Sequence, residues 1–332
     1  MEAQSFAFEK VNDGIRILRC YGVSGRVTIP EALEGLPVTE VADYTFAEEM
    51  DWEPENTSGL PCICGDALEE LDLPQTVRRL GRYVFYNCTG FRKLSFYSNI
   101  AYMGAGGFTG CGNLAHLVCY QQDGPSCLRE ILQDLKQSVV VDCYWDRAPA
   151  AAGGSDSQNQ RGEAEGSSER RNLRCRLVYP EFFEEAVENT PARIISTQTH
   201  GMGIQYRNTF RNTGIVFAEY DKLFETGKYN MDLTDNIKIS AARLSCPWEL
   251  SEDAEAGYAS WLRQHIREGA AYFLEQGQRE EIKWMAESFA ETKEELDLLV
   301  QAAGVRKDTE VLSSLMDISH RRFPGKRKRF AL

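Results

Sequence analysis

The chain has 332 residues, of which 42% are hydrophobic, and its 50 acidic residues outnumber its 37 basic ones to give a formal net charge of −13. A chain of this length can hold two hydrophobic cores, and its acidic balance argues against general nucleic-acid affinity. The start, MEAQSFAFEK, lacks the basic and apolar parts of a signal peptide. No stretch approaches the roughly 20 apolar residues of a membrane helix. We therefore expect a cytoplasmic protein without a membrane segment.

The first residues predict a β-hairpin. Two short segments, SFAFEK and IRILRCYG, flank Asp13-Gly14, a dipeptide typical of tight hairpin turns. Because the terminal unit of a repeat array needs a covered outer face, we expect this hairpin to form an N-terminal cap on the repeats that follow.

A repeat of 23 residues follows the hairpin. Shifting the chain by 23 residues aligns Leu71, Leu94 and Leu117. The same shift aligns a glycine, a phenylalanine and a cysteine in each unit: Gly81 with Gly104, Phe85 with Phe108, and Cys88 with Cys111. A fixed period in this range with a short Leu-x-Leu strand is the signature of a leucine-rich-repeat solenoid, in which each unit forms one coil. Within each strand the leucines point inward and alternate residues point outward.

Three segments carry a family resemblance: TIPEALEGLPVTEVADYTF, LDLPQTVRRLGRYVFYNCTGFRKL and LSFYSNIAYMGAGGFTGCGNL. They resemble the BspA-type leucine-rich repeats of bacterial proteins, over about residues 27–145. The chain departs from that pattern at Thr45, Val84 and Gly107, where the family usually has alanine. The resemblance implies a short solenoid used for protein–protein interaction.

Two irregularities are expected in the solenoid. The segment AEEMDWEPENTSGLPCICGDALEE is polar and contains proline and glycine, which predicts a loop that lengthens the first coil. Later, PSCLREILQDLKQ carries apolar residues at helical spacing, so a helix replaces part of a coil. Beyond it, the 23-residue shift carries Leu117 to Val140 in SVVVDCYW, which predicts a fourth strand.

The remaining chain predicts a linker and a second domain. Residues 147–172 contain no aliphatic side chain larger than alanine and no aromatic one, which is typical of a flexible linker. After it, LRCRLVY suits one strand, whereas YPEFFEEAVEN, the segment from Ser251 to Gln276 and TKEELDLLVQAAG predict helices. Two of the later helices weakly resemble ankyrin-type helix pairs. We therefore predict an α+β protein with a solenoid at 1–146, a linker at 147–172, a mainly helical domain at 173–325 and a basic tail at 326–332.

Five outward positions on the strands are candidates for partner binding. Tyr97 and Tyr120 occupy the same place in successive repeats, so their rings should lie side by side. They lie next to three further outward residues: Asp72, Ser95 and Val118. Exposed tyrosines are common interface anchors, because one ring combines apolar area with a hydroxyl group. Alternatively, these tyrosines only shield the edge of the core.

The ten cysteines admit structural and chemical interpretations. Cys88 and Cys111 lie on neighbouring coils at a separation compatible with a disulfide. A reducing cytosol favours buried, reduced thiols that fill the core instead. Cys62 and Cys64 lie closer in sequence than the pairs of usual zinc knuckles, and no second pair has metal spacing. We therefore predict no metal and no cofactor.

Catalytic signals are weak. His200 is followed by Gly-x-Gly and lies near Arg193, Arg207 and Arg211, so an anion-receiving loop or an enzyme site around His200 is one alternative. No Ser/His/Asp order, Walker loop or His-Glu-x-x-His sequence occurs, and His265 suits a packed or solvated helix position. We therefore assign no catalytic residues.

The basic end of the chain supports another alternative. RRFPGKRKRF contains six basic residues and no acidic one: Arg321, Arg322, Lys326, Arg327, Lys328 and Arg329. These residues could hold an anion or a nucleic acid, although the acidic body would repel a polyanion. The leading interpretation is a non-enzymatic module that binds an unidentified protein through its concave strand face. The sequence does not set the oligomeric state.

Overall fold

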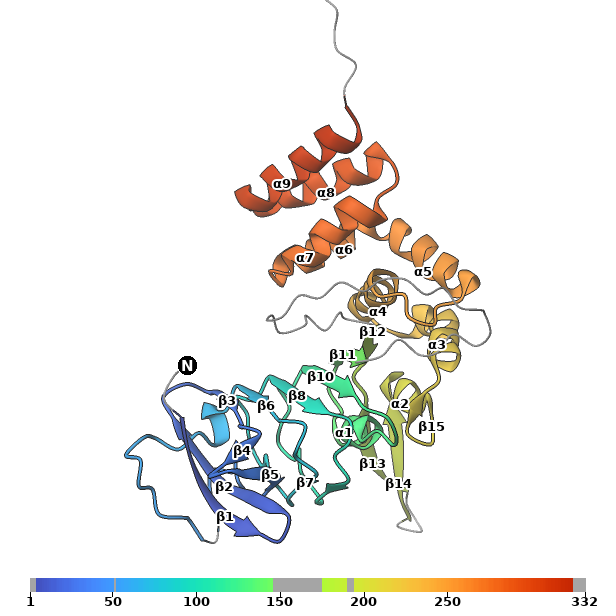
Figure 1. The fold of residues 1–332 in the computed structure, drawn as a ribbon. Helices are drawn as coiled ribbons and strands as arrows, with labels where there is room; N and C mark the ends of the chain where they lie inside the picture. Colours follow the sequence, from blue (N-terminus) through green and yellow to red (C-terminus); the bar gives the residue numbers. More distant parts are fainter. Residues whose placement is uncertain (1–3, 51, 146–174, 190–193, 325–332) are drawn as a thin grey trace, which may run out of the picture. The chain divides into compact units, whose positions relative to one another are not determined.

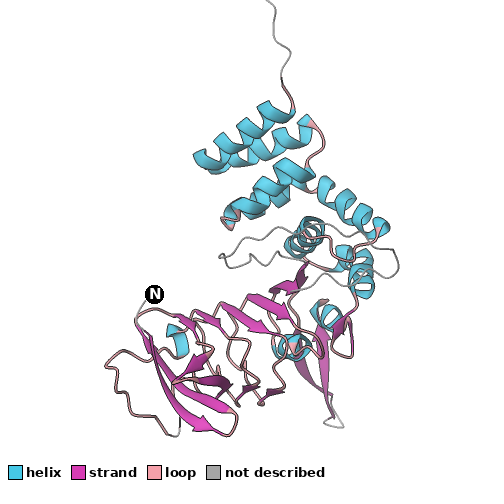
Figure 2. Ribbon diagram, in the orientation of Figure 1, coloured by secondary structure: helices cyan, strands magenta, loops and turns pink. Residues whose placement is uncertain are grey.

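The computed structural model describes residues 4–50, 52–145, 175–189 and 194–324 (Figure 1). The chain divides into two compact units, Met1–Val216 and Phe217–Leu332. In the described residues the first unit is mainly strands and the second is helical (Figure 2). The predicted linker at 147–172 and the predicted basic tail at 326–332 lie outside the described residues.

The N-terminal hairpin is confirmed. Strand β1 (Gln4–Val11) pairs antiparallel with β2 (Gly14–Gly22), and Val11 lies opposite Gly14 across the predicted turn. On its other side β2 pairs with the first repeat strand β5, so the hairpin covers the open edge of that sheet.

The first unit is a β-solenoid with two sheets. One sheet contains β2, β5 (Leu36–Val41), β7 (Arg79–Leu80) and β9 (Tyr102–Met103), with β1 at its edge and β4 (Ala32–Leu33) paired with β5. The facing sheet contains β3 (Arg26–Thr28), β6 (Glu70–Asp72), β8 (Lys93–Tyr97), β10 (His116–Gln121), β11 (Val139–Trp145) and β12 (Cys175–Tyr179). The chain alternates between the sheets, one strand in each per coil, which produces the stacked arrangement in Figure 1.

The predicted strand register is confirmed. Leu71 lies opposite Leu94, and Leu94 lies opposite Leu117, on parallel strands. All three leucines are fully buried. Val27 lies opposite Leu71, so the long loop between them leaves the register intact. A short 3-10 helix, η1 (Gly65–Ala67), precedes β6.

Phenylalanines stack through the coils beneath the leucines. The ring of Phe85 lies 5.6 Å from that of Phe46 and 5.2 Å from that of Phe108, measured between centroids. All three rings are buried. Each coil therefore contributes one aromatic ring to a continuous core, as the 23-residue repeat predicts.

The repeated glycine marks a close approach between coils. A Cβ atom on Gly81 would lie 2.3 Å from the backbone nitrogen of Asp43, and one on Gly104 would lie 2.3 Å from that of Arg82. Both contacts involve backbone atoms of the preceding coil, so a side chain at either position forces the coils apart. The glycine is needed for this approach.

The repeated cysteine fills the core and also donates a hydrogen bond. The Cys88 thiol lies 3.2 Å from the carbonyl oxygen of Phe46, and the Cys111 thiol lies 3.0 Å from that of Phe85. Both cysteines are buried, and burial raises the pKa of Cys111 to about 12. Each thiol is therefore held in its protonated form against the preceding coil.

A helix replaces a strand in the last coil. Helix α1 (Leu128–Asp134) falls where its apolar spacing predicts, and β11 follows it. Leu117 lies opposite Val141, however, so the shift here is one residue longer than the predicted pairing with Val140. The helix that takes the place of this strand accommodates one more residue.

The first unit continues beyond the predicted linker. Strand β12 pairs antiparallel with β11, as LRCRLVY allowed. The segment predicted to start a helix, YPEFFEEAVEN, instead contains β13 (Phe183–Asn189), which pairs with β14 (Ile194–His200). The β-branched residues of IISTQTH supply a partner strand, and this pairing outweighs the local helix signals. A short helix and hairpin complete the unit: α2 (Gly203–Arg207), β15 (Phe210–Arg211) and β16 (Gly214–Ile215).

The boundary therefore differs from our prediction. We placed the helical domain at 173–325, whereas the compact second unit begins at Phe217. Residues 175–216 contain strands and a short helix that pack with the solenoid. The polar segment at 147–172 suggested a domain boundary at that place. The residues after it nevertheless pack with the solenoid, so the boundary lies further along the chain.

The second unit is helical in its described residues, as expected. Its elements are α3 (Phe217–Asn230), α4 (Leu233–Ser245), α5 (Glu252–Gln264), α6 (Ile266–Glu275), α7 (Arg279–Trp284), the π-turn η2 (Met285–Phe289), α8 (Lys293–Arg306) and α9 (Thr309–Arg322). Ser251 caps α5, and Thr292 with Glu295 forms the predicted capping box of α8. The single helix predicted from Ser251 is broken at His265, whose backbone leaves the helical region. The ankyrin resemblance stays a prediction.

A buried ion pair joins three helices of the second unit. Arg243 on α4 donates two hydrogen bonds to the Asp221 carboxylate on α3, at 2.7 and 2.9 Å. The Tyr258 hydroxyl on α5 donates a third, at 3.0 Å. Asp221 is 7% exposed and Arg243 is fully buried, so each charge depends on the other for its compensation.

Candidate interaction surfaces of the solenoid

Three of the predicted partner-binding residues lie in one row across the strands. Asp72 pairs in register with Ser95, and Ser95 pairs with Val118. Asp72 is exposed, whereas Ser95 is 5% and Val118 is 7% exposed. Short side chains have little access to solvent when longer ones flank them on the same face of a strand, as Lys93 and Tyr97 flank Ser95. Ser95 and Val118 are thus buried positions, contrary to our expectation of an accessible row.

The two predicted tyrosines belong to a row of three. The ring of Tyr97 lies 5.0 Å from that of Tyr120, which lies 5.5 Å from the ring of Tyr144. All three side chains are half-buried and come from the parallel strands β8, β10 and β11. We name Tyr97, Tyr120 and Tyr144 the tyrosine row. Tyr144 was missed because the last coil is one residue longer; a shift of 24 aligns it with Tyr120.

Ion pairs line the other side of the same face. Glu70 on β6 lies 3.2 Å from Arg26 on β3 and 3.9 Å from Lys93 on β8. Thr28 donates a hydrogen bond of 3.4 Å to Asp72. These contacts run from strand to strand, so the charged side chains follow the same register as the tyrosine row.

A buried carboxylate lies in register with Val118 on the next strand. Asp142 on β11 receives two hydrogen bonds from Arg176 on β12, at 2.7 and 3.0 Å, and lies 3.0 Å from His116 Nε2. Burial raises the pKa of Asp142, but the hydrogen bonds from His116 and Arg176 outweigh burial and lower this pKa to about 2. The cluster ties the antiparallel strand β12 to the parallel sheet.

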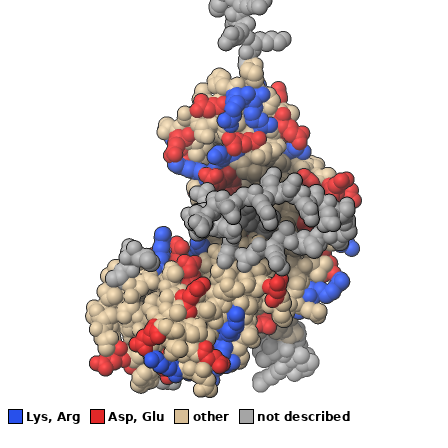
Figure 3. All heavy atoms as spheres, in the orientation of Figure 1, with Lys and Arg blue, Asp and Glu red and all other residues tan. Residues whose placement is uncertain are grey.

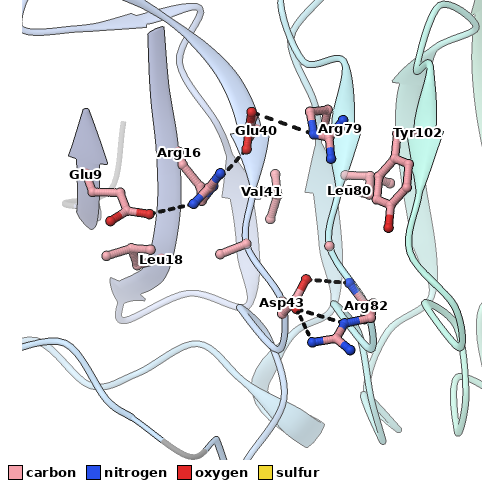
Figure 4. Close-up of a pocket in the computed structure, with 12 residues that line it drawn as sticks. Glu9, Arg16, Leu18, Glu40, Val41, Asp43, Arg79, Leu80, Arg82 and Tyr102 are labelled. Atoms are coloured by element: carbon pink, nitrogen blue, oxygen red, sulfur yellow. Dashed lines mark hydrogen bonds and ion pairs between the residues drawn. The ribbon is translucent and has the colours of Figure 1, made fainter. Parts of the chain in front are cut away.

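A groove of about 400 Å³ lies on the opposite sheet (Figure 4). It crosses β1, β2, β5, β7 and β9, and Figure 4 shows acidic and basic side chains alternating across these strands. Arg16 lies 2.8 Å from Glu9 and 2.7 Å from Glu40. The Arg79 guanidinium lies 4.3 Å from the centre of the Tyr102 ring.

The charges in this groove compensate one another. Asp43 accepts hydrogen bonds from the backbone nitrogen of Arg82 at 2.7 Å and from its side chain at 3.0 Å. Arg79 completes the pattern at 3.7 Å from Glu40. Both signs of charge are also intermixed on the faces visible in Figure 3. Each arginine in the groove therefore already has an acidic neighbour.

The expected loop around His200 does not form as predicted. His200 ends β14, where its ring stacks on Phe183 at 4.7 Å and its Nε2 lies 3.4 Å from Glu185. Arg193 lies outside the described residues. His200 therefore lies on a hairpin beside a carboxylate.

Arg207 has a structural role that the sequence did not indicate. Its guanidinium is fully buried, and burial lowers its pKa to about 10. It donates hydrogen bonds to five backbone carbonyl oxygens, those of Leu132, Leu135, Gln137, Pro180 and Gly203. These contacts occupy Nε and both terminal nitrogens. Arg207 therefore joins the end of α1 to α2. We expected it to be available to an incoming anion, and it is not.

The two described residues of the predicted anion site belong to α9. Arg321 pairs with Glu287 at 3.1 Å, and Arg322 donates to the carbonyl oxygen of Ala286 at 2.5 Å. Both contacts attach the end of α9 to the π-turn η2. The other predicted residues, Lys326, Arg327, Lys328 and Arg329, lie outside the described residues. Anion binding by this segment stays a prediction.

The described residues contain neither a candidate metal site nor a helix suited to a membrane. Within these ranges, no three His, Cys, Asp or Glu side chains come together in a way that would hold a metal ion. No helix in the same ranges is long and apolar enough to cross a membrane.

Comparisons with known proteins agree with the solenoid. Residues 62–131 match the family model described as the BspA type leucine rich repeat region (6 copies), which confirms the resemblance for these residues. The fold is thus a leucine-rich-repeat solenoid followed by a helical region, and such a fold suggests a protein-interaction module. No curated protein matches the chain.

Two solved structures are similar to parts of the chain. The T. pallidum leucine-rich-repeat protein TpLRR is 26% identical, covers 36% of this chain and has a TM-score of 0.23. A leucine-rich cell surface protein from Faecalibacterium prausnitzii A2-165 is 22% identical, covers 35% of this chain and has a TM-score of 0.25. The chain spans 51% of the first structure and 28% of the second.

Proposed function

We propose that the solenoid is a non-enzymatic protein-binding module and that its partner contacts the tyrosine row. The observation that carries this proposal is the alignment of Tyr97, Tyr120 and Tyr144 at ring separations of 5.0 and 5.5 Å on parallel strands. Aromatic side chains are enriched in the centres of protein interfaces. A sheet holds them in fixed positions, which lowers the entropic cost of binding.

The neighbouring charges suggest the chemistry of the partner. Asp72 is exposed on the same face, one strand before Tyr97. Its carboxylate suits a lysine or arginine of a partner, while the tyrosine rings suit an apolar or aromatic side chain. We propose a protein partner that presents an apolar side chain beside a basic one. A cytoplasmic location is part of the same proposal.

Site-specific crosslinking tests where the partner binds. A photoreactive phenylalanine analogue at Tyr120 should capture a protein in the cells that naturally make this chain. The same analogue at Tyr229 in the second unit, which is 81% exposed, provides a matched control. We expect a product from the first position that the control lacks.

Binding of the captured protein, once purified, then measures the contribution of the tyrosine row. We expect Tyr120→Ala to weaken binding roughly tenfold or more, as for a central interface aromatic. Tyr229→Ala should leave the affinity unchanged. Equal affinity of the Tyr120→Ala variant and the unmodified protein would show that the partner binds elsewhere.

A further inference from the structure

The hairpin of β13 and β14 forms a sheet of its own among the described residues (Figure 1). The two strands pair along their full length, from Phe183 opposite His200 to Asn189 opposite Ile194. No third strand lies beside either of them in the described ranges. An isolated two-stranded hairpin is only marginally stable in water, so this element is incomplete by itself.

The base of the hairpin is fixed to the last coil of the solenoid. The backbone nitrogen of Phe182 donates to the carbonyl oxygen of Lys136 at 3.0 Å, and the Phe182 side chain is 3% exposed. The Lys136 side chain also pairs with Glu184 on β13 at 2.6 Å. The solenoid therefore holds the hairpin in one place, where a partner strand can meet it.

Beyond its base, the hairpin is exposed on both faces. Alternate residues of a strand point to opposite faces. Glu185 and its register partner Gln198 lie on one face, whereas Ala186 and its register partner Thr197 lie on the other. All four residues are exposed. Because neither face is buried, backbone hydrogen bonds to a further strand are what the hairpin can gain.

The two edges of the hairpin differ in charge. Strand β13 has the sequence FEEAVEN, with adjacent glutamates at Glu184 and Glu185. Strand β14 has the sequence IISTQTH, which contains no lysine, arginine, acidic residue or proline and is rich in β-branched residues. Natural proteins usually protect an open strand edge with charged residues or proline. The β14 edge lacks this protection and is suited to pairing.

The β14 edge is complementary to itself. Antiparallel pairing of two β14 strands about Thr197 places Thr197 opposite its own copy and Ser196 opposite Gln198. These pairs are uncharged and can exchange hydrogen bonds. The glutamates of the two β13 strands then lie about 14 Å apart on the outer edges, beyond the Debye length of about 8 Å. Pairing through β13 would instead bring Glu184 and Glu185 against those of the second copy.

We propose that two copies of this chain associate by antiparallel pairing of their β14 strands about Thr197. The contact is the same on both copies, as a two-fold axis requires, and it joins two hairpins into one four-stranded sheet. It uses no residue of the tyrosine row. A dimer of this kind therefore carries two tyrosine rows and can hold a partner at two points.

A charge placed on the two-fold axis tests the contact in the full-length protein. Thr197→Lys sets two like charges opposite each other, so it should weaken dimerisation about tenfold or more. Ala186→Lys is the matched control, because Ala186 is exposed and lies in register with Thr197 on the outer strand. Sedimentation velocity over a range of concentrations gives the dissociation constants. A wild-type monomer at every concentration, or equal dimerisation of both variants, would overturn the proposal.

Complementary charges test the register and show that the variants fold. Thr197→Glu should also weaken dimerisation, because it too places like charges on the axis. A mixture of the Thr197→Lys and Thr197→Glu variants should dimerise at least as tightly as the wild type, since opposite charges then face each other. Failure of the mixture to associate would contradict pairing centred on Thr197.

Hydrogen exchange locates the contact on β14. In the wild type, the backbone amides of residues 194–200 should exchange more slowly as the protein concentration rises. In the Thr197→Lys variant this dependence should be lost. A dimer without concentration-dependent protection of these residues would place the interface elsewhere. Protection that requires a different protein would assign the edge to that protein and would likewise exclude self-association.

Discussion

Arg207 Nε lies 2.8 Å from the carbonyl oxygen of Leu135, the residue at which α1 ends. This contact links positions that are far apart in sequence and sit on either side of the segment predicted as a linker. Together with the bonds to Pro180 and Gly203, it attaches the chain after β12 to the last coil. The end of the solenoid is therefore held by a buried cation and backbone carbonyl groups.

Arg207→Met should destabilise the first unit by about 3–5 kcal/mol, because it leaves several buried carbonyl oxygens without donors. Urea unfolding of the first unit, monitored by intrinsic fluorescence, measures this change in the free energy of unfolding. Arg92→Met, at an exposed position of the same unit, should change the free energy of unfolding by less than about 0.5 kcal/mol. Similar values for the two variants would contradict the structural role of Arg207.

Phe85→Ala should cost about 3–5 kcal/mol, because it removes the central ring of the aromatic stack between Phe46 and Phe108. Denaturant melts give the comparison with Tyr86→Ala, which removes a neighbouring ring that is 39% exposed. We expect the control to cost less than about 1 kcal/mol. A small loss at Phe85 would mean that the coils do not share one core.

Gly81→Ala should cost about 1–3 kcal/mol, because the added methyl group meets the backbone of the preceding coil. Gly112→Ala is the matched control, since a Cβ atom there meets nothing within 4 Å. Thermal unfolding should separate the two variants. Equal melting temperatures would argue against the close stacking of the coils.

Asp142 predicts how stability depends on pH. Its pKa of about 2 in the folded protein lies below the unfolded value, so its contribution is complete above about pH 4 and is lost as pH falls toward 2. The shift corresponds to about 2 kcal/mol. Urea melts should therefore show that the difference between the wild type and Asp142→Asn shrinks by that amount between about pH 6 and pH 2. A constant difference would show that the carboxylate pKa is not lowered.

Asp221→Asn should destabilise the second unit by about 3–5 kcal/mol, because Arg243 stays buried without its compensating charge. Hydrogen exchange of peptides from residues 217–324 reports on this unit alone. Glu275→Gln, which breaks an exposed pair with Arg306, should cost less than about 1 kcal/mol. Equal protection in both variants would count against the importance of the buried pair.

The sequence was sufficient to predict the repeats, since each coil satisfies its own apolar pattern. Leu94 and Phe85 were placed correctly because stacking repeats the same environment every 23 residues. The pattern failed where the repeat changes: the longer last coil concealed Tyr144, and Phe183 lies on a strand that its local sequence did not favour. Pairing with β14, the next strand along the chain, decided that strand.

The long-range polar contacts could not be predicted in the same way. Nothing near Arg207 in the sequence indicates that its side chain binds carbonyl groups of α1 and of the segment after β12. A repeat pattern predicts which residues are inside, whereas the partners of a buried cation depend on the completed fold.

The glycine contacts repeat from coil to coil, whereas the structures at the two ends of the solenoid do not. This difference has an evolutionary consequence. Gly81 and Gly104 fit any two successive coils, while the hairpin at one end and β12 with Arg207 at the other each occur once. Duplication or loss of one 23-residue unit between β7 and β10 would thus lengthen or shorten the sheets by about 4.8 Å and leave both ends intact. Related chains could vary the length of the surface in single steps without rebuilding its terminal contacts.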